Sequence, residues 1–328
     1  MSLLVIDAAT VRAQLHPADC IAELRGAMIA LSDGRARQPL RSVMDLADGD
    51  AFGVMPGTLD DGSFGAKLIS VFPRNFERGL SSHQGLITLF DADSGAPVAI
   101  VDASSVTALR TAAASALATD ALARPDARVL ALLGYGEQAA THLHAISHVR
   151  DIAEVRVWGR SRERADAFVA HERADAHARG AVLRACDDVG AAIAGADIVC
   201  CLTAASEPIL FGHQLEAGMH LNLVGSGRAG PVEVDDAVVQ RTRFFADHRE
   251  SVLRQGAEFL RAKQAGLVVD SHVLGEIGDV LAGRLIGRRD AEDITAYKSL
   301  GSIVQDLAAA RFHVRRARER GFGTVIGF

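Results

Sequence analysis

The most constraining feature of the chain is a glycine-rich turn that follows an apolar run. Val129-Leu130-Ala131-Leu132-Leu133 is typical of a buried strand, and Gly134-Tyr135-Gly136-Glu137-Gln138-Ala139 comes directly after it. Gly134 permits a tight turn, Gly136 lets the backbone approach a pyrophosphate, and Ala139 lets the next helix pack closely. The N–H groups at the start of that helix favour phosphate. We therefore expect all six residues of the turn to bind a dinucleotide, although an ordinary glycine-rich turn is the alternative.

Strands and helices alternate around and beyond this turn. Apolar strand-like runs occupy residues 128–133, 154–158, 181–186, 197–203, 220–224 and 243–247, with helical segments between most of them. Such alternation predicts an α/β domain, a doubly wound parallel sheet of the Rossmann type with helices on both faces.

The first part of the chain has a different pattern. Residues 7–33 have helical spacing, and residues 40–102 contain short β-like runs broken by Gly, Pro and Asp. An alanine-rich helix is expected over 104–123, ended by Pro125, and a last helix over 299–320 that packs back on the first domain. We therefore expect a discontinuous α+β substrate and dimerisation domain (1–124 and 299–328) and a dinucleotide-binding domain (125–298).

Composition excludes several classes of function. The net charge is −6, and no Lys/Arg cluster is interleaved with aromatic residues, so nucleic acid is not an expected partner. The basic stretch 311–320 is interpreted as the solvated face of a helix. No apolar run reaches the roughly 18–20 residues of a membrane helix, and the four cysteines form no C-x-x-C pair. We expect a soluble cytoplasmic protein with buried, reduced thiols and no metal site.

The residues after the second predicted strand bear on the choice of dinucleotide. NAD-binding units usually place an acid there to hydrogen-bond the ribose 2′-OH. Here the strand 154–158 leads into Gly159-Arg160-Ser161-Arg162, which carries no acid. Arg160, Ser161 and Arg162 suit a 2′-phosphate, so NADP(H) is favoured and NAD(H) remains possible. Alternatively, Ser161 only caps the next helix and both arginines face solvent.

Three cations of the first domain are candidates for holding an anionic substrate. Arg41 begins a predicted strand, Lys67 lies within Gly65-Ala66-Lys67-Leu68, and Arg110 precedes Thr111 near the start of the long helix. A helix start favours an anion. Spacing alone does not show that the three converge, and each by itself could be a surface charge.

The chain resembles the ornithine cyclodeaminase/mu-crystallin family over nearly its whole length. The matching stretches are Lys67 with 72–75, Ser81-Ser82-His83-Gln84-Gly85, Thr107-Ala108-Leu109-Arg110-Thr111-Ala112-Ala113, 132–139, Asn222-Leu223-Val224-Gly225-Ser226 and 294–301. The resemblance implies a homodimer that acts on α-amino or α-imino acids. It also implies that Arg41, Lys67 and Arg110 hold the substrate carboxylate and that Thr111 contacts the cofactor phosphates.

Three departures from the cyclodeaminase branch are informative. Gly53 and Gly227 stand where the cyclodeaminases carry a Glu and a catalytic Asp, and Gly159 stands where they keep an Asp. Cyclisation of ornithine needs a base to assist the attacking amine. The run Ser82–Gln84 and the Trp-Gly-Arg-Ser segment are more similar to the mu-crystallin, ketimine reductase side.

These observations lead to a hypothesis of NADPH-dependent reduction of a cyclic or open α-imino acid, such as Δ1-pyrroline-2-carboxylate or Δ1-piperideine-2-carboxylate. The protonated imine needs a proton source, for which Lys67 and His83 are the candidates. Ser226, at the end of the fifth strand, could bond to the substrate or to the cofactor carboxamide. The alternatives are an alanine-dehydrogenase-like amino-acid dehydrogenase, ornithine cyclodeaminase itself, and a non-catalytic NADPH- and small-ligand-binding protein.

Overall fold

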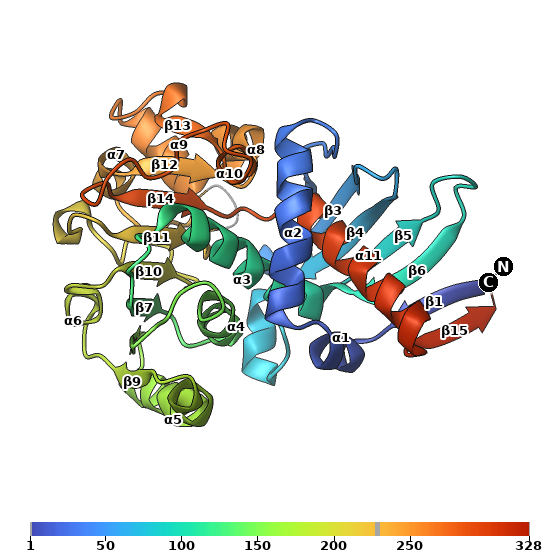
Figure 1. Cartoon of the computed structure of the whole chain (residues 1–328), viewed down its shortest axis with the longest axis horizontal. Coiled ribbons are helices and arrows are strands. Elements are labelled where there is room, and N and C mark those ends of the chain that lie inside the picture. Colours follow the sequence, from blue (N-terminus) through green and yellow to red (C-terminus); the bar gives the residue numbers. More distant parts are fainter. Residues whose placement is uncertain (1, 227–229, 328) are drawn as a thin grey trace. The chain divides into compact units, whose positions relative to one another are not determined.

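The chain forms two compact units in the computed structural model, which describes residues 2–226 and 230–327. Unit 1 comprises Met1–Arg110 and Ser302–Phe328, and unit 2 comprises Thr111–Gly301. The division falls inside the long helix α3 (Ala103–Leu122), between Arg110 and Thr111. Unit 1 therefore contains both ends of the chain (Figure 1).

Unit 1 is built on a mixed seven-stranded sheet. Its strands lie in the order β15 (Thr324–Gly327), β1 (Ser2–Ile6), β6 (Pro97–Asp102), β5 (His83–Phe90), β4 (Phe64–Val71), β3 (Ala51–Thr58) and β2 (Ser42–Asp45). Only β1 and β6 pair in parallel. Its helices are α1 (Ala8–Gln14), α2 (Pro17–Ser32), α11 (Ile303–Arg320) and the first half of α3, with 3-10 turns at Ala47–Gly49 and Pro73–Arg78.

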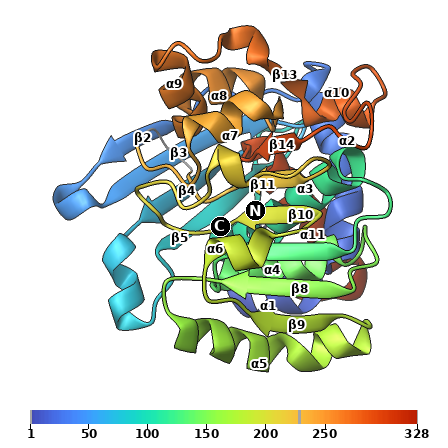
Figure 2. The same ribbon diagram turned by 90° about the vertical axis from the view of Figure 1, so that its left-hand side faces the viewer.

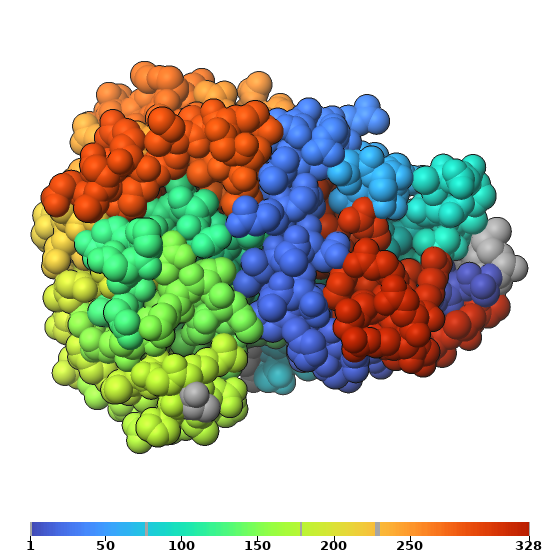
Figure 3. Space-filling model, viewed as in Figure 1, coloured from blue at the N-terminus to red at the C-terminus, as the bar shows by residue number. Residues whose placement is uncertain are grey.

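The two faces of this sheet differ in burial. α11 packs on one face, against β3, β4 and β5, and α2 packs against α11 (Figures 1 and 3). Alternate residues of β4 and β5, including Gly65, Lys67 and Ile87, are buried on that face. Their neighbours in sequence are only half-buried. Period-two alternation thus selects which side chains the helices cover.

Unit 2 is built on an eight-stranded parallel sheet. Its strands lie in the order β13 (Val273–Glu276), β12 (Arg243–Ala246), β14 (Thr295–Lys298), β11 (His220–Leu223), β10 (Ile198–Cys201), β7 (Val129–Leu133), β8 (Glu154–Trp158) and β9 (Val182–Ala185) (Figure 2). The helices between them are α4 (Glu137–Ile146), α5 (Arg162–Ala178), α6 (Val189–Ile193), α7 (Asp236–Arg241), α8 (Arg249–Gln255), α9 (Ala257–Gln264) and α10 (Ile277–Leu281), with 3-10 turns at Gly212–Gln214 and Asp270–His272.

The chain reverses its direction of winding at β7. This strand pairs in parallel with β8 on one side and with β10 on the other. The connection after β7 leads to β8 and the connection after β10 leads to β11, so the two run in opposite directions across the sheet. In open α/β sheets ligands bind beyond the carboxyl ends of the strands at such a reversal. The predicted Rossmann-type sheet is confirmed, and its reversal lies next to the glycine-rich turn.

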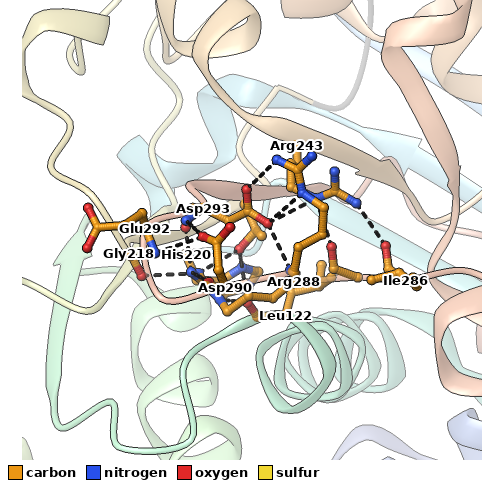
Figure 4. A network of polar contacts seen from close by, with 12 residues as sticks. Leu122, Gly218, His220, Arg243, Ile286, Arg288, Asp290, Glu292 and Asp293 are labelled. Atoms are coloured by element: carbon orange, nitrogen blue, oxygen red, sulfur yellow. Dashed lines mark hydrogen bonds and ion pairs between the residues drawn. The ribbon is translucent and has the colours of Figure 1, made fainter.

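The opposite, amino-terminal edge of the sheet is held by arginines (Figure 4). Arg288 donates to the carbonyl of Leu122 (2.7 Å), to the carbonyl of Gly218 (3.1 Å) and to Thr295 Oγ1 (3.2 Å). Arg243 donates to the carbonyls of Gly287 and Ile286, both at 2.9 Å. Charged donors thus satisfy backbone carbonyls at this edge.

Several predicted elements have different bounds in the structure. The helical stretch 7–33 is two helices, because Pro17 begins a new helix after Leu15 and His16. The last helix begins at Ile303, where the Ser302 hydroxyl accepts from Val304 N (3.1 Å), and not at 299. The strands β1, β13, β14 and β15 were not predicted.

The expectation for the cysteines is confirmed, since all four are buried and free.

Candidate active site

Lys67 points from β4 towards α11 and is almost completely buried. Its neighbours on the same side of the strand, Gly65 and Ile69, are also buried under α11. The Lys67 Nζ donates to Thr107 Oγ1 (2.6 Å) and lies 3.2 Å from Asp306 Oδ1. The side chains of Lys67 and Asp306 are 3% and 0% exposed. A buried ammonium requires such partners, because it has lost its hydration.

Arg110 converges on the same carboxylate. Its Nε donates to Asp306 Oδ1 (2.8 Å) and its Nη1 to Gln305 Oε1 (2.9 Å). Thr107 and Arg110 are three residues apart on α3 and so share one face of that helix. Asp306 lies in the first turn of α11, where the helix dipole favours a negative charge. One buried carboxylate therefore binds two buried cations, from β4 and α3.

The charge balance of this cluster leaves an excess of positive charge. Burial lowers the pKa of Lys67 to about 8; the carboxylate of Asp306 opposes this shift, and the charges of Arg110 and Arg41 add to it. Arg41, half-buried before β2, is therefore near enough to act on Lys67. Two cations with one anion form a site that favours one added negative charge.

His83 is the first residue of β5 and lies within the electrostatic field of Lys67 and Arg110. Its Nδ1 lies 2.9 Å from Ser82 Oγ, and its carbonyl accepts from Ser104 Oγ. Loss of hydration, together with the charges of Lys67 and Arg110, lowers the pKa of His83. The imidazole is therefore neutral at neutral pH, which favours an acceptor or a polar contact over a cationic role.

The glycine-rich turn of unit 2 has the backbone that a dinucleotide requires. Gly134 has φ +136°, and a Cβ there would lie 2.7 Å from the carbonyl oxygen of Leu202. Gly136 is exposed, and a Cβ on it would meet nothing within 4 Å. Ala139 is fully buried in the first turn of α4. The turn therefore leaves an open backbone path to the start of α4, the feature that suits a pyrophosphate.

Other residues of the turn and of α3 flank this start. Tyr135 is half-buried and Glu137 is exposed. The Oε1 atom of Gln138 is buried and has no hydrogen-bond partner among the described side chains and backbone. Thr111 is 7% exposed. His142, which the sequence did not single out, lies 2.7 Å from the Gln138 carbonyl through Nδ1 and 2.9 Å from Ser115 Oγ through Nε2. This histidine ties α4 to α3, and burial lowers its pKa to about 4.

The three residues predicted to bind a 2′-phosphate have different surroundings. Ser161 caps α5, because its Oγ accepts from Arg164 N (3.2 Å). Arg162 pairs with Asp166 (3.0 Å) and with Asp187. Arg160 is exposed. Arg162 is thus engaged by two acids, while Ser161 and Arg160 remain compatible with an anion.

Ser226 lies just past β11, on a backbone held by a buried ion pair. Lys298 Nζ donates to the Ser226 carbonyl (2.8 Å) and lies 2.8 Å from Glu258 Oε2, with both charged side chains 0% exposed. The Ser226 hydroxyl is buried and has no partner in the described part of the chain. Lys298 and Glu258 were not predicted as site residues.

A second buried acid, Glu233, joins the loops that follow β10 and β11. It accepts from Thr203 N (2.6 Å), Thr203 Oγ1 (2.7 Å) and Gly225 N (2.7 Å). Burial raises the pKa of Glu233 to about 7 in spite of these donors. A Cβ on Gly225 would lie 2.5 Å from the Glu233 carboxyl carbon, so only glycine fits. Glu233 thus sets the backbone directly before Ser226.

The positions that depart from the cyclodeaminases contribute no acid in the described residues. Gly53 is buried in β3, where a Cβ would lie 3.2 Å from Ile69 Cγ2. Gly227 lies outside the described residues. The side chains that the structure describes include no group of His, Cys, Asp and Glu suited to a metal ion. Among the helices described, none is long and apolar enough to cross a membrane.

Comparison with known proteins adds independent findings. A model of the ornithine cyclodeaminase/mu-crystallin family matches residues 2–321. The chain is 34% identical to ketimine reductase mu-crystallin of Mus musculus over 281 residues, 85% of each protein. It is similar in structure to Δ1-pyrroline-2-carboxylate reductase of Thermococcus litoralis, solved with NADH and L-proline (TM-score 0.94, 29% identity, 98% of this chain and 99% of that one). It also resembles an archaeal alanine dehydrogenase dimer with bound NAD (TM-score 0.93, 27% identity, 100% of both chains).

Replacement of Asp306 tests the cation cluster. Asp306→Asn leaves two buried cations without their shared counter-charge, so we expect the free energy of unfolding to fall by about 3–5 kcal/mol. Urea denaturation measures this change. Asp60→Asn, which breaks an exposed pair with Arg35 in the same unit, serves as the control and should match the wild type. Equal stability of both variants would contradict the role given to Asp306.

Proposed function

The chain belongs to the ornithine cyclodeaminase/mu-crystallin family, and we propose that it is an NADPH-dependent ketimine reductase, which reduces an α-imino acid to an L-α-amino acid. One observation carries the choice of substrate class. Lys67 and Arg110 are buried around a single carboxylate, Asp306, and leave positive charge for one α-carboxylate. Δ1-pyrroline-2-carboxylate and Δ1-piperideine-2-carboxylate are the first candidates.

The residues present fit a dinucleotide, which would supply the hydride that the imine carbon accepts. The backbone of Gly134 and Gly136 and the start of α4 would hold the pyrophosphate, with Thr111 and the polar side chains of the turn beside it. Gly159 lacks the acid that would bond a ribose 2′-OH, and Arg160 and Ser161 suit a 2′-phosphate. These features favour NADPH, with NADH as the alternative. We propose residues 125–298 as the cofactor domain and 1–124 with 299–328 as the substrate domain.

The cations bind and orient the substrate. Lys67 and Arg110, with Arg41 nearby, pair with the α-carboxylate and so set the direction of the adjoining C=N bond. Asp306 and Gln305 prevent the Arg110 side chain from turning away. A preorganised clamp of this kind lowers the entropy cost of the reaction.

Lys67 is the better proton source for the imine nitrogen. Its pKa near 8 makes it a stronger acid than an exposed lysine, and it remains protonated at neutral pH. His83 is already neutral there, because its pKa is lowered. Lys67 Nζ thus donates the proton, and His83 contributes a polar contact. Ser226, whose hydroxyl has no partner in the described chain, bonds to substrate or cofactor.

An amino-acid dehydrogenase is the second candidate, because the archaeal alanine dehydrogenase has a closely similar fold. The same clamp would hold a 2-oxo acid. Ornithine cyclodeaminase is disfavoured, since Gly53 offers no carboxylate.

A homodimer is part of the proposal. The sheet face of unit 1 turned away from α11 carries Val54, Leu68, Leu86 and Ile100 and the stacked rings of Phe64 and Phe90 (5.3 Å between centroids). All six side chains are only half-buried. A contiguous, partly exposed apolar surface is typical of an interaction site. The four buried, free cysteines fit a reducing compartment, and we propose the cytoplasm.

Activity is tested by the rate of NADPH oxidation. We expect rapid oxidation with Δ1-pyrroline-2-carboxylate or Δ1-piperideine-2-carboxylate. In Arg110→Met, kcat/KM should fall about 100-fold or more, since a charge-assisted hydrogen bond is worth about 3 kcal/mol. Arg35→Met, at an exposed ion pair, is the control. Oxidation only with ammonia and a 2-oxo acid would favour a dehydrogenase. Ammonia release from L-ornithine, or cofactor binding with no reaction, would overturn the reductase assignment.

The pH dependence of carboxylate binding tests Lys67. Its ammonium is present below about pH 8 and lost above, so affinity for pyrrole-2-carboxylate, a stable planar mimic, should fall about tenfold per pH unit above that value. Isothermal titration calorimetry measures it. Lys67→Met should bind weakly at every pH without this decline. Persistence of the decline in Lys67→Met would assign it to another group.

The dimer is tested by sedimentation velocity. Ile100→Glu places a charge on the apolar sheet face, so we expect it to convert a dimer into single chains. Val182→Glu, on the exposed edge strand β9 of unit 2, is the matched control and should not change the mass. A monomeric wild type, or a dimeric Ile100→Glu, would overturn the proposed interface.

A further inference from the structure

The ring of Tyr135 rests on the backbone of Gly159. Tyr135 is the second residue of the glycine-rich turn after β7, and Gly159 directly follows the neighbouring strand β8. A Cβ on Gly159 would overlap Cδ1 and Cε1 of Tyr135 and lie 3.2 Å from its Cζ. The turn is held beside β8, because Gly134 N donates to the Trp158 carbonyl (2.7 Å). The ring therefore occupies the space that any side chain at position 159 would need.

The contact between Tyr135 and Gly159 restricts which side chain can stand beside the ribose. Position 159 is where a dinucleotide domain carries the acid that bonds the ribose 2′-OH. While Tyr135 keeps this position, no acid can stand there. The contact between ring and glycine thus excludes the usual NADH-selecting carboxylate by packing.

The ring of Tyr135 also contacts the side chain of Arg164. Its Cζ lies 4.9 Å from the centre of the Tyr135 ring, a cation–π contact. Its backbone N–H donates to Ser161 Oγ, which places it in the first turn of α5. The side chain is exposed, and no acid forms an ion pair with it among the side chains that the structure describes. An aromatic ring orients the guanidinium without neutralising it.

Arg162, on the same turn, provides the contrast. Its guanidinium pairs with Asp166 (3.0 Å) and also with Asp187, so its charge is more than balanced. Of the arginines beside this turn, Arg164 and the exposed Arg160 keep their charge for an anion. Guanidinium groups bind phosphate by paired hydrogen bonds.

We infer that Tyr135, Gly159 and Arg164 form a selectivity element for the 2′-phosphorylated ribose of NADPH. Tyr135 excludes an acid at position 159 and orients Arg164, and Arg164 binds the 2′-phosphate, with Arg160 as a second cation. Arg162 has no part in this recognition. The inference rests on the proposed dinucleotide-binding function and deepens it by naming the residues that choose the cofactor.

Binding measurements test the element without relying on turnover. Titration calorimetry with NADPH, NADH and 2′,5′-ADP gives the affinities, and quenching of Trp158, the only tryptophan, reports binding beside Gly159. Arg164→Met should lower NADPH affinity about 10- to 100-fold and leave NADH affinity unchanged. Arg162→Met is the matched control and should keep the wild-type ratio. Tyr135→Phe should also keep it, while Tyr135→Ala should lose part of the preference.

A double variant tests the exclusion of the acid. Tyr135→Ala with Gly159→Asp removes the ring and supplies a carboxylate, so NADH affinity should rise and NADPH affinity should fall. Thermal unfolding confirms that each variant is folded. A wild type that binds NADH as tightly as NADPH, or an Arg162→Met variant more affected than Arg164→Met, would overturn the inference but not dinucleotide binding. A wild type that binds neither cofactor would overturn the proposed function itself.

Discussion

The shared ion pair of Asp306 is the interaction on which unit 1 depends. One carboxylate joins Lys67 of β4 and Arg110 of α3 to the first turn of α11, and the contact with Lys67 spans 239 residues of sequence. Removal of these charges from water is costly, so each requires its partners. The ion pairs that hold the sheet and its helices together also fix two cations in place, and these cations exceed the single carboxylate by one positive charge. Stability and the proposed anion binding therefore have the same physical source.

Unit 2 uses buried charge in a similar way at the carboxyl edge of its parallel sheet. Glu233 connects the loops after β10 and β11, and Lys298 holds the carbonyl of Ser226. At the opposite edge, Arg243 and Arg288 satisfy backbone carbonyls. Parallel sheets leave polar backbone groups at both ends. Here one end is closed by arginines, whereas the other is ordered by acids and a lysine beside the expected ligand site.

The sequence supported different parts of the site to different degrees. The turn from Gly134 to Ala139 could be predicted because its requirements, a positive φ and a small helix residue, are local. Lys67 and Arg110 could be named as candidates from the residues, but their convergence was implied only by the resemblance, because it depends on α11. No sequence pattern indicated that Asp306 is buried, because a single acid in a helix rich in charged residues is usually solvated. Arg162 was predicted to face a phosphate, but Asp166 and Asp187 engage it.

The chain by itself thus determined the alternation of strands and helices, the dinucleotide turn and the apolar faces, because periodicity and backbone preference act over a few residues. The short strands β1, β13, β14 and β15 were not predicted, because tertiary pairing forms them. Only the tertiary structure decided which charges meet. Ion pairs between residues such as Lys67 and Asp306 form when packing brings distant segments together and removes water, and no local pattern encodes that event.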